Sequence, residues 1–288
     1  MRILVTGATG FLGRHLVRAL AAHKHDIAIL TRAGSDLSVL NGIELEALDT
    51  STAPIAELLK GRAFDALIHC ATAYGRRGES DFGVFDTNTR FALEVLEAAA
   101  AHSTPLFINA DTALPQNANA YALSKKQFRD WGERYAEAGR IRFINIELEH
   151  FYGSGDSPTK FSTFLIRQCL DNVPEVKLTE GTQIRDFIHI DDVTAAFLLV
   201  LEKHANAEPA FENYSLGSGE GIAIRALAEL IKELSGSETT FNFGAIPFRP
   251  NEAMRLVADP ARLLKMGWKP QMSLRDGLKR TIEEERKS

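Results

Sequence analysis

Three glycines near the N-terminus constrain the fold more than any other feature of this sequence. They form the pattern Gly7-x-x-Gly10-x-x-Gly13. A short apolar run at 2–6 precedes them, and apolar residues at helical spacing follow over 11–22. A strand, a glycine turn and a helix in this order let the backbone approach a pyrophosphate, which the N–H groups of the helix N-terminus can bind. We therefore predict a nucleotide-binding start, against the alternative of a glycine turn that only packs tightly.

Apolar runs then alternate with helical patterns along the chain. We expect strands at 26–30, 43–48, 66–69, 105–109 and 140–146, and helices at 55–60, 86–101 and 122–138. This alternation is typical of a parallel, doubly wound sheet. After residue 146 the regular alternation of strands and helices ends. The segment 149–160 is rich in Gly, Ser, Pro and Asp, which predicts a loop, and the remainder mixes short strands and helices.

The predicted fold class is therefore α/β, a doubly wound parallel sheet of the Rossmann type with a smaller C-terminal substrate lobe. We expect residues 1–150 to form a dinucleotide-binding domain. Residues 151–288 are expected to form mainly a substrate-binding lobe, with segments near 182–216 returning to the Rossmann sheet.

Composition and charge exclude several classes of protein. Hydrophobic residues at 45% and charged residues at 25% are typical of a globular protein. A net charge of -5 gives no reason to expect nucleic acid or an anionic membrane as a partner. No apolar run approaches the ~18 residues that span a bilayer, and the N-terminus lacks the layout of a signal peptide. Cys70 and Cys169 have no metal-ligand spacing, so we expect free thiols, no metal site and a cytoplasmic location.

A tyrosine and a lysine four residues apart, in Tyr121-Ala-Leu-Ser-Lys125, share one face of a predicted helix. The ammonium can lower the pKa of the phenol from its usual value of about 10, so that the phenol exchanges a proton with an alcohol or ketone. Alone, this pattern is weak. Combined with the nucleotide-binding start, it predicts a nicotinamide cofactor and an acid/base tyrosine acting on one carbon centre.

The residues after the second and third strands bear on the choice of cofactor. A carboxylate after the second strand favours NAD, because it accepts a hydrogen bond from the ribose 2′-hydroxyl. This chain instead has Arg32, with its first acid at Asp36. Arg32 could pair with a 2′-phosphate, so we favour NADP, with NAD still possible and an exposed surface arginine as the alternative. Asp49 could bind the adenine amine or be a plain loop aspartate.

In these residues the chain resembles the extended short-chain dehydrogenase/reductases, in particular the nucleotide-sugar epimerases and reductases. The resemblance runs nearly end to end through an ordered series of motifs: the three glycines, Ile68-His69-Cys70-Ala71, Asn88, Tyr121 with Lys125, Phe151-Tyr152-Gly153, Arg185-Asp186-Phe187-Ile188-His189, Asn213-Tyr214-Ser215-Leu216-Gly217 and Arg249-Pro250. Within the family, the segments 109–112 and 147–153 resemble the CDP-abequose and CDP-paratose synthases. Those enzymes reduce the 4-keto group of a nucleotide-linked deoxyhexulose.

The resemblance implies a role for each matching residue. Tyr121 would donate and accept the proton, Lys125 would tune it and contact the nicotinamide ribose, and Asn88 would hold the active-site helix and a proton-relay water. The implied cofactor contacts are Gly7, Thr9, Gly10, Phe11, Leu12, Gly13, Arg32, Asp49, Ala71, Tyr121 and Lys125. Arg185 and Arg249 match positions that grip the diphosphate of a sugar nucleotide.

The sequence departs from the family pattern after the fifth strand. Relatives carry a Ser/Thr-rich patch there, whereas this chain has Asn109-Ala110-Asp111-Thr112. If the family's hydroxyl is kept, it must come from Thr112. An ungapped register could instead place Asp111 there, which would require a protonated carboxyl group. We favour Thr112.

The leading hypothesis is NADPH-dependent reduction of the 4-keto group of a CDP- or dTDP-linked 4-keto-6-deoxyhexose. The alternative is an NAD-dependent nucleotide-sugar 4-epimerase, and a third hypothesis is a non-catalytic NADP-binding regulator. The resemblance also makes a homodimer plausible, through the helices at 86–101 and 121–138. Packing on the sheet explains their apolar faces equally well.

Overall fold

The structure is a computed structural model that describes residues 1–76, 78–205, 207–250 and 252–287. The chain divides into two compact units. Unit 1 comprises Met1–Glu147 and Thr194–Tyr214, and unit 2 comprises Leu148–Val193 and Ser215–Ser288. Each unit is therefore built from segments that are far apart in the sequence.

Unit 1 contains the strands and helices that the glycine pattern and the strand–helix alternation predict, together with elements that these patterns did not predict. They are β1 (Arg2–Thr6), α1 (Phe11–Ala22), β2 (Asp26–Thr31), η1 (Ser38–Leu40), β3 (Glu46–Asp49), α2 (Ile55–Leu59), β4 (Ala66–His69), α3 (Asp81–Phe85), η2 (Asp86–Phe91), α4 (Ala92–Ala101), β5 (Leu106–Thr112), η3 (Gln116–Ala118), α5 (Ala120–Glu137), β6 (Arg142–Leu148), α7 (Ile190–His204) and β10 (Phe211–Leu216). The ends of β6, α7 and β10 cross the boundaries between the units.

A seven-stranded sheet organises these elements, in the order β10-β6-β5-β4-β1-β2-β3. The pairings β1–β2, β2–β3, β1–β4 and β4–β5 are parallel. The chain moves outward from β1 to β3 and then returns to β4 on the other side of β1. In such sheets ligands bind at the carboxyl ends of the strands beside this reversal. The predicted α/β fold with a doubly wound sheet is confirmed.

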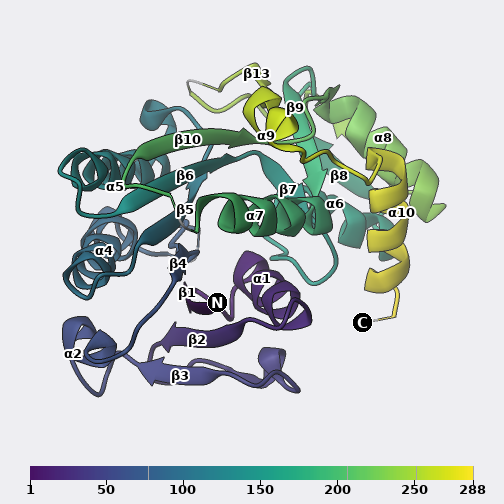
Figure 1. The fold of residues 1–288 in the computed structure, drawn as a ribbon. Helices are drawn as coiled ribbons and strands as arrows, with labels where there is room; N and C mark the ends of the chain where they lie inside the picture. Colours follow the sequence, from purple (N-terminus) through teal and green to yellow (C-terminus); the bar gives the residue numbers. More distant parts are fainter. Residues whose placement is uncertain (77, 206, 251, 288) are drawn as a thin grey trace. The chain divides into compact units, whose positions relative to one another are not determined.

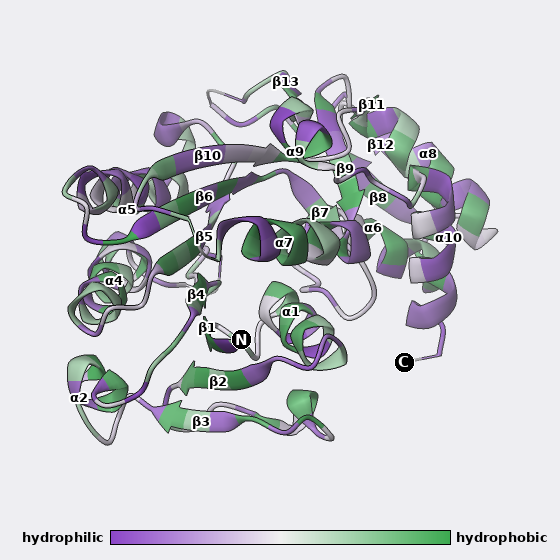
Figure 2. Cartoon of the chain, in the orientation of Figure 1, coloured by the Kyte–Doolittle hydropathy of each residue, from purple (hydrophilic) through white to green (hydrophobic). Residues whose placement is uncertain are grey.

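Helices cover both faces of this sheet. In Figure 1, α2, α4 and α5 lie in a row at one side of the sheet, and α1 lies at the other. Right-handed crossovers in opposite directions from β1 produce this arrangement. The central strands are largely apolar because both faces are buried; Ile3, Leu4 and Val5 of β1 have no exposed surface. α1 shows the matching pattern for a helix, with hydrophobic and hydrophilic positions on different sides (Figure 2).

Unit 2 consists of shorter elements. They are β7 (His150–Tyr152), α6 (Phe161–Leu170), β8 (Glu175–Leu178), β9 (Ile184–His189), β11 (Gly221–Ala223), α8 (Ile224–Ser235), β12 (Thr240–Phe243), β13 (Arg255–Leu256), α9 (Ala261–Met266) and α10 (Leu274–Glu285). β9 pairs with β11, β13 and β7, and β12 pairs with β8. A core of its own, including Tyr152, Leu227 and Leu278, holds these elements together.

Two sequence-based boundaries differ from the structure. The predicted loop at 149–160 contains β7, which pairs in parallel with β9, so a partner far along the chain fixes a strand that local composition obscures. The helix predicted from residue 86 is continuous with α3, which begins at Asp81. The Ser80 hydroxyl caps it by accepting the N–H of Gly83 at 3.1 Å, and Gly83 itself is a weak helix former that hides the start.

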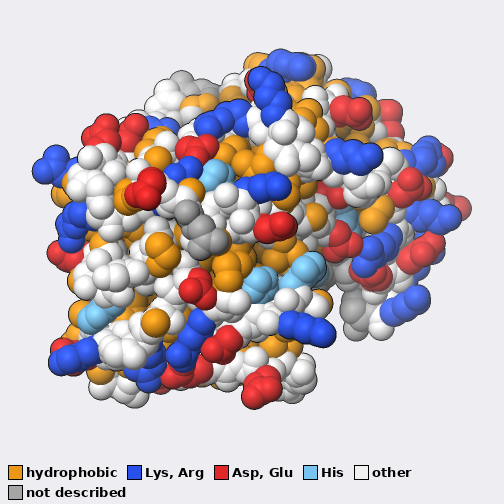
Figure 3. All heavy atoms as spheres, viewed as in Figure 1, with side chains coloured by type: hydrophobic (Ala, Val, Ile, Leu, Met, Phe, Trp, Pro, Cys, Tyr) orange, Lys and Arg blue, Asp and Glu red, His pale blue; other side chains and the backbone are white. Residues whose placement is uncertain are grey.

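The outer surface mixes charges of both signs. On the face drawn in Figure 3, Lys and Arg side chains are interspersed with Asp and Glu. Among the described residues, none of the helices has both the length and the apolar character that crossing a bilayer requires.

Candidate active site

Two of the three N-terminal glycines are required by the protein's own packing. Gly7 has a φ of +66°, and a Cβ added to it would lie 2.5 Å from the backbone nitrogen of Ala71. A Cβ on Gly13 would lie 2.1 Å from the carbonyl oxygen of Gly7. Both distances are far below van der Waals contact, so a side chain at either position would force β1 away from β4 or from α1.

Gly10 has a different environment. It forms the N-cap of α1 with an extended backbone, and no side chain of the described residues caps this helix. An added Cβ would approach the carbonyl oxygen of Gly7 at 3.2 Å, and Gly10 itself is exposed. A helix N-terminus that no side chain caps can bind the phosphates of a dinucleotide through its backbone N–H groups. Thr9, Phe11 and Leu12 are the chain neighbours of this turn, with Leu12 buried beneath it.

Arg32 and Asp49, the two residues predicted to contact the adenosine part of the cofactor, lie at the ends of adjacent strands. Thr31, the last residue of β2, is in register with Asp49 of β3, and Arg32 follows directly as an exposed residue. The carboxylate of Asp49 accepts the backbone N–H of Ser51 at 2.8 Å. Hydrogen bonds from the backbone and side chain of Ser51 lower the pKa of Asp49. Asp49 therefore already shapes its own turn, while Arg32 extends into solvent.

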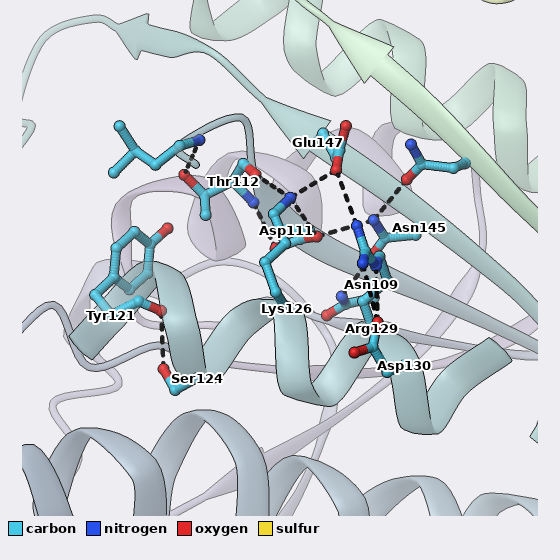
Figure 4. Close-up of polar contacts among 12 residues, drawn as sticks. Asn109, Asp111, Thr112, Tyr121, Ser124, Lys126, Arg129, Asp130, Asn145 and Glu147 are labelled. Atoms are coloured by element: carbon cyan, nitrogen blue, oxygen red, sulfur yellow. Dashed lines mark hydrogen bonds and ion pairs between the residues drawn. The ribbon is translucent and has the colours of Figure 1, made fainter. Parts of the chain in front are cut away.

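Tyr121 lies in the first turn of α5, where the Asn119 side chain caps the helix by accepting the N–H of Ala122 at 2.8 Å. Its ring packs against Tyr74, with ring centroids 5.0 Å apart. Thr112, at the end of β5, lies beside the phenol (Figure 4), and its side chain acts on the pKa of Tyr121 in the lowering direction. Thr112 and Tyr121 thus place two hydroxyl groups together at the carboxyl end of the sheet.

The pKa of Tyr121 is raised well above its usual value. Burial is the main cause, followed by the neighbouring Tyr74, while the Thr112 side chain lowers the pKa in part. The prediction of a phenol with a lowered pKa is therefore wrong, because burial outweighs the charges around it. Arg76, in the loop after β4, is the cation that acts on the phenol in the lowering direction.

Lys125 is fully buried, and its Nζ has no hydrogen-bond partner within the described part of the chain. Burial lowers its pKa, and the nearby charges of Asp111 and Cys70 raise it in part. A buried ammonium without an acceptor needs a group that the protein does not supply. The hydroxyls of a nicotinamide ribose are such a group. This unpartnered ammonium and the helix N-terminus at Gly10, which no side chain caps, are both compatible with a nicotinamide dinucleotide.

Asn88 ties the site together from η2, where the backbone forms a π turn. Its side chain exchanges two 2.8 Å hydrogen bonds with the backbone of Ala73 and donates to the Ser124 hydroxyl at 3.0 Å. Ser124 immediately precedes Lys125. Asn88 therefore fixes the loop after β4 against the helix that carries the lysine.

Arg185 and Arg249 lie in unit 2. Arg185 is buried in β9 and forms an ion pair with Glu252. The backbone N–H of Glu252 donates to the carbonyl oxygen of Arg249 at 3.1 Å, and Arg249 is exposed. Glu252 therefore links the two arginines, and their role toward a diphosphate stays a prediction.

Sequence reasoning missed the polar cluster behind Thr112. Asp111 accepts hydrogen bonds from the backbone of Thr112, from Asn145 and from Lys126 (Figure 4). The carboxylate of Glu147 also accepts from Lys126, at 2.6 Å. The available signal was one acid shortly after each of two consecutive predicted strands, Asp111 and Glu147. A second lysine, Lys126, stands next to the motif lysine. Among the residues that the structure describes, no group of three or more His, Cys, Asp or Glu could hold a metal ion.

Comparisons with known proteins establish the family and the fold of this chain. A sequence model of the "NAD dependent epimerase/dehydratase family" matches residues 3–217. The chain is 33% identical to CDP-abequose synthase of Salmonella typhimurium, over 98% of this chain and 97% of that protein. It is 30% identical to CDP-abequose synthase of Salmonella muenchen, over the same shares of both chains. Among solved structures, the UDP-glucose 4-epimerase of Thermotoga maritima with UDP-glucose has a TM-score of 0.86 and 22% identity, covering 100% of this chain and 99% of that one. This last likeness shows a shared fold.

Proposed function

Because this chain belongs to the NAD dependent epimerase/dehydratase family, we propose that it reduces the 4-keto group of a nucleotide-linked 4-keto-6-deoxyhexose with NADPH. Membership makes it an NAD(P)-dependent oxidoreductase of the extended short-chain dehydrogenase/reductase type. The observation that carries the proposal is the proximity of the Tyr121 and Thr112 side chains (Figure 4), together with the unpartnered ammonium of Lys125 four residues along the same helix.

Each of these three residues has a task in the proposed reduction. Bound NADPH supplies the hydride for C4. Tyr121 gives its phenolic proton to the sugar oxygen, and its raised pKa keeps the phenol protonated until then. Thr112 donates a hydrogen bond to the same oxygen as negative charge develops there. Lys125 binds the nicotinamide ribose and adds positive charge to the site.

The choice of NADP as the cofactor and of CDP as the carrier nucleotide rests on two observations. Arg32 stands exposed at the end of β2, where an NAD enzyme would use a carboxylate, and this supports NADP. The names of the two curated relatives support CDP as the carrier nucleotide, with dTDP as the second choice. Asp49 is proposed to contact the adenine, and Arg185 with Arg249 the diphosphate.

The alternative is an NAD-dependent 4-epimerase that uses the same residues to remove and return hydrogen at C4. The likeness to a UDP-glucose 4-epimerase favours it. Arg32 at the end of β2 weighs against it, because an NAD enzyme would use a carboxylate there. A non-catalytic NADP-binding regulator would have no use for the Tyr121 and Lys125 pair.

We also propose that two copies of the chain associate. Most apolar residues of α4 and α5 pack on the sheet, as Val95, Leu96 and Phe128 show. Trp131 of α5 and Phe82 and Phe85 of α3 are instead exposed, and they support a homodimer contact. Both cysteines are free thiols, which is consistent with the proposed cytoplasmic location.

The test is to follow NADPH absorbance with CDP- and dTDP-linked 4-keto-6-deoxyhexoses offered separately. The proposal expects loss of NADPH with one of them. It also expects that Tyr121→Phe abolishes turnover while NADPH still binds. No consumption with either sugar, together with NAD released on denaturing the protein, would favour the epimerase. NADPH binding without turnover of any sugar nucleotide would favour the regulator.

A further inference from the structure

α5 carries two adjacent lysines with opposite surroundings. Lys125 has no acceptor within the described chain. The Nζ of Lys126 donates to the backbone carbonyl of Thr112 at 2.7 Å, to Asp111 Oδ2 at 3.2 Å and to Glu147 Oε1 at 2.6 Å (Figure 4). An ammonium has three N–H donors, so these bonds use all of them. Lys126 is therefore not available to a ligand, and its effect must pass through the groups that it holds.

Those groups lie at the ends of β5 and β6, which are neighbours in the sheet. Lys126 reaches both strand ends from α5, so one side chain fastens the helix of Tyr121 to the two strands. The side chain of Lys126 is 8% exposed and that of Asp111 is fully buried. Charge-assisted hydrogen bonds hold their geometry best where water is excluded.

This clamp determines how Thr112 is presented. Its N–H donates to Asp111 Oδ1 at 2.7 Å, and its carbonyl accepts from Lys126. Its hydroxyl oxygen accepts the N–H of Leu114 at 3.2 Å. With the backbone held on both sides and the hydroxyl oxygen accepting from Leu114, the hydroxyl group is fixed beside Tyr121 and its proton remains available for donation (Figure 4).

We infer that Lys126 is a positioning residue for the proposed reduction, holding the Thr112 backbone so that the Thr112 hydroxyl meets Tyr121 and the substrate oxygen. The inference rests on the proposed function. Lys126 also faces the charge of Asp111, and that charge raises the pKa of Tyr121. Removing Lys126 would therefore disturb both the geometry and the proton affinity of the pair.

A purely structural role for Lys126 would consist of neutralising two buried acids. The chain offers a matched control for that role in Arg129, one turn further along α5. Arg129 Nη1 lies 3.7 Å from the same carboxylate oxygen of Glu147. Unlike Lys126, it has no bond to Thr112 among the described contacts. Arg129→Met therefore removes a cation from Glu147 and leaves the clamp on Thr112 intact.

The test compares Lys126→Met, Lys126→Arg and Arg129→Met by steady-state kinetics and NADPH binding. Lys126→Met should lower kcat by about 10- to 100-fold and leave the KM for the sugar and the Kd for NADPH within about twofold. The alkaline limb of its kcat–pH profile should move to higher pH. Lys126→Arg, which keeps the charge and the donors, should recover part of kcat. An unchanged kcat in Lys126→Met, or an equal loss in Arg129→Met, would overturn the inference.

If Lys126→Met does not fold, the double variant Asp111→Asn/Lys126→Met removes both buried charges together. It should keep a low kcat, because the carbonyl of Thr112 still lacks its donor. A kcat at the level of the unmodified chain would show that Lys126 only neutralises Asp111, and would overturn the inference.

Failure of the proposed function gives a different result. If the unmodified chain reduces none of the offered sugars, the function is wrong and kinetics cannot be used. Crystal structures of the unmodified chain and of Lys126→Met then decide. The inference expects Thr112 to leave Tyr121 in the variant, and an unmoved Thr112 would overturn it.

Discussion

At the scale of single residues, the ammonium of Lys125 imposes a cost on the ligand-free chain. It is fully buried and has no acceptor in the described structure, so the charged form is disfavoured in the folded state. The lowered pKa of Lys125 expresses the same penalty, because burial favours the neutral amine over the ammonium. A residue that destabilises the fold and lies four residues from Tyr121 on α5 is expected where a ligand completes the site.

Lys125→Met should therefore stabilise the ligand-free protein. We expect its Tm to rise by roughly 2–4 °C for each kcal/mol of relieved desolvation. NADPH should no longer raise the Tm as it does in the unmodified chain. Thermal unfolding with and without NADPH measures both, and Lys60→Met at an exposed lysine is the control. An unchanged or lower Tm, with a normal response to NADPH, would contradict this account.

Lys125 should also make the stability of the folded chain depend on pH. The unfolded chain keeps a proton on Lys125 up to about 10.5, whereas the folded chain loses it earlier because burial lowers the pKa. The unfolded state thus binds more protons in this range, and stability from this group rises with pH until about 10.5. Lys125→Met should lack this rise. Urea unfolding midpoints measured from neutral to alkaline pH, for both chains, test the sign.

Arg32 should determine the choice between NADPH and NADH. If its guanidinium pairs with the 2′-phosphate, Arg32→Ala loses charge-assisted hydrogen bonds worth about 1.5–3 kcal/mol. We expect the Kd for NADPH to rise by about 10- to 100-fold, since about 1.4 kcal/mol corresponds to tenfold. The Kd for NADH serves as an internal control and should change little. Equal effects on both cofactors would mean that Arg32 does not recognise the phosphate.

At the scale of elements, α5 carries both the Tyr121 motif and a tight contact with the sheet. Gly132 faces β6, and a Cβ added there would lie 2.2 Å from the ring of Phe143. Phe143 is itself fully buried in an aromatic cluster with Phe107 and Phe128. The ring therefore fills the space that a side chain at Gly132 would need.

Gly132→Ala should destabilise the protein although alanine is the better helix former. The intrinsic gain is about 1 kcal/mol, and overpacking a core costs about 1–3 kcal/mol. We expect a net loss in the free energy of unfolding, measured by urea titration. Gly83→Ala in α3 is the control, since its Cβ would meet its nearest neighbour at an ordinary 3.6 Å. Stabilisation of both variants would show that the Phe143 ring moves aside freely.

The elements also show how far sequence reasoning reaches. The strand–glycine–helix start and the predicted α5 are encoded locally, by apolar periodicity and by glycines that no other residue can replace. The clamp of Lys126 was not predictable, because it joins three segments whose proximity is a property of the folded sheet. The raised pKa of Tyr121 was missed for the same reason. It depends on burial and on Tyr74, which comes from a loop far away in the sequence.

At the scale of the whole molecule, unit 1 depends on a segment that comes long after its other strands. The guanidinium of Arg142 in β6 is buried, and its partners are His204, the carbonyl of Glu208 and Glu212. All three belong to Thr194–Tyr214. Without that segment, an arginine would be left in the core without its counter-charge.

A fragment of residues 1–147 should therefore fail to fold cooperatively or bind NADPH. The same fragment joined to 194–214 by a flexible linker should regain a cooperative urea transition. Circular dichroism and NADPH fluorescence measure the two properties. Cooperative unfolding of 1–147 alone, at an undiminished midpoint, would show that β10 and the end of α7 are dispensable to the sheet.

The late arrival of β10 also has a consequence for synthesis on the ribosome. Once residue 147 has been made, β6 remains an open edge until the segment up to residue 214 follows. At roughly 5–20 residues per second, this takes on the order of several seconds. During that time the nascent chain exposes an unpaired strand that can associate with other chains. Synonymous codons that slow translation between 148 and 214 should therefore lower the yield of folded protein without changing any amino acid.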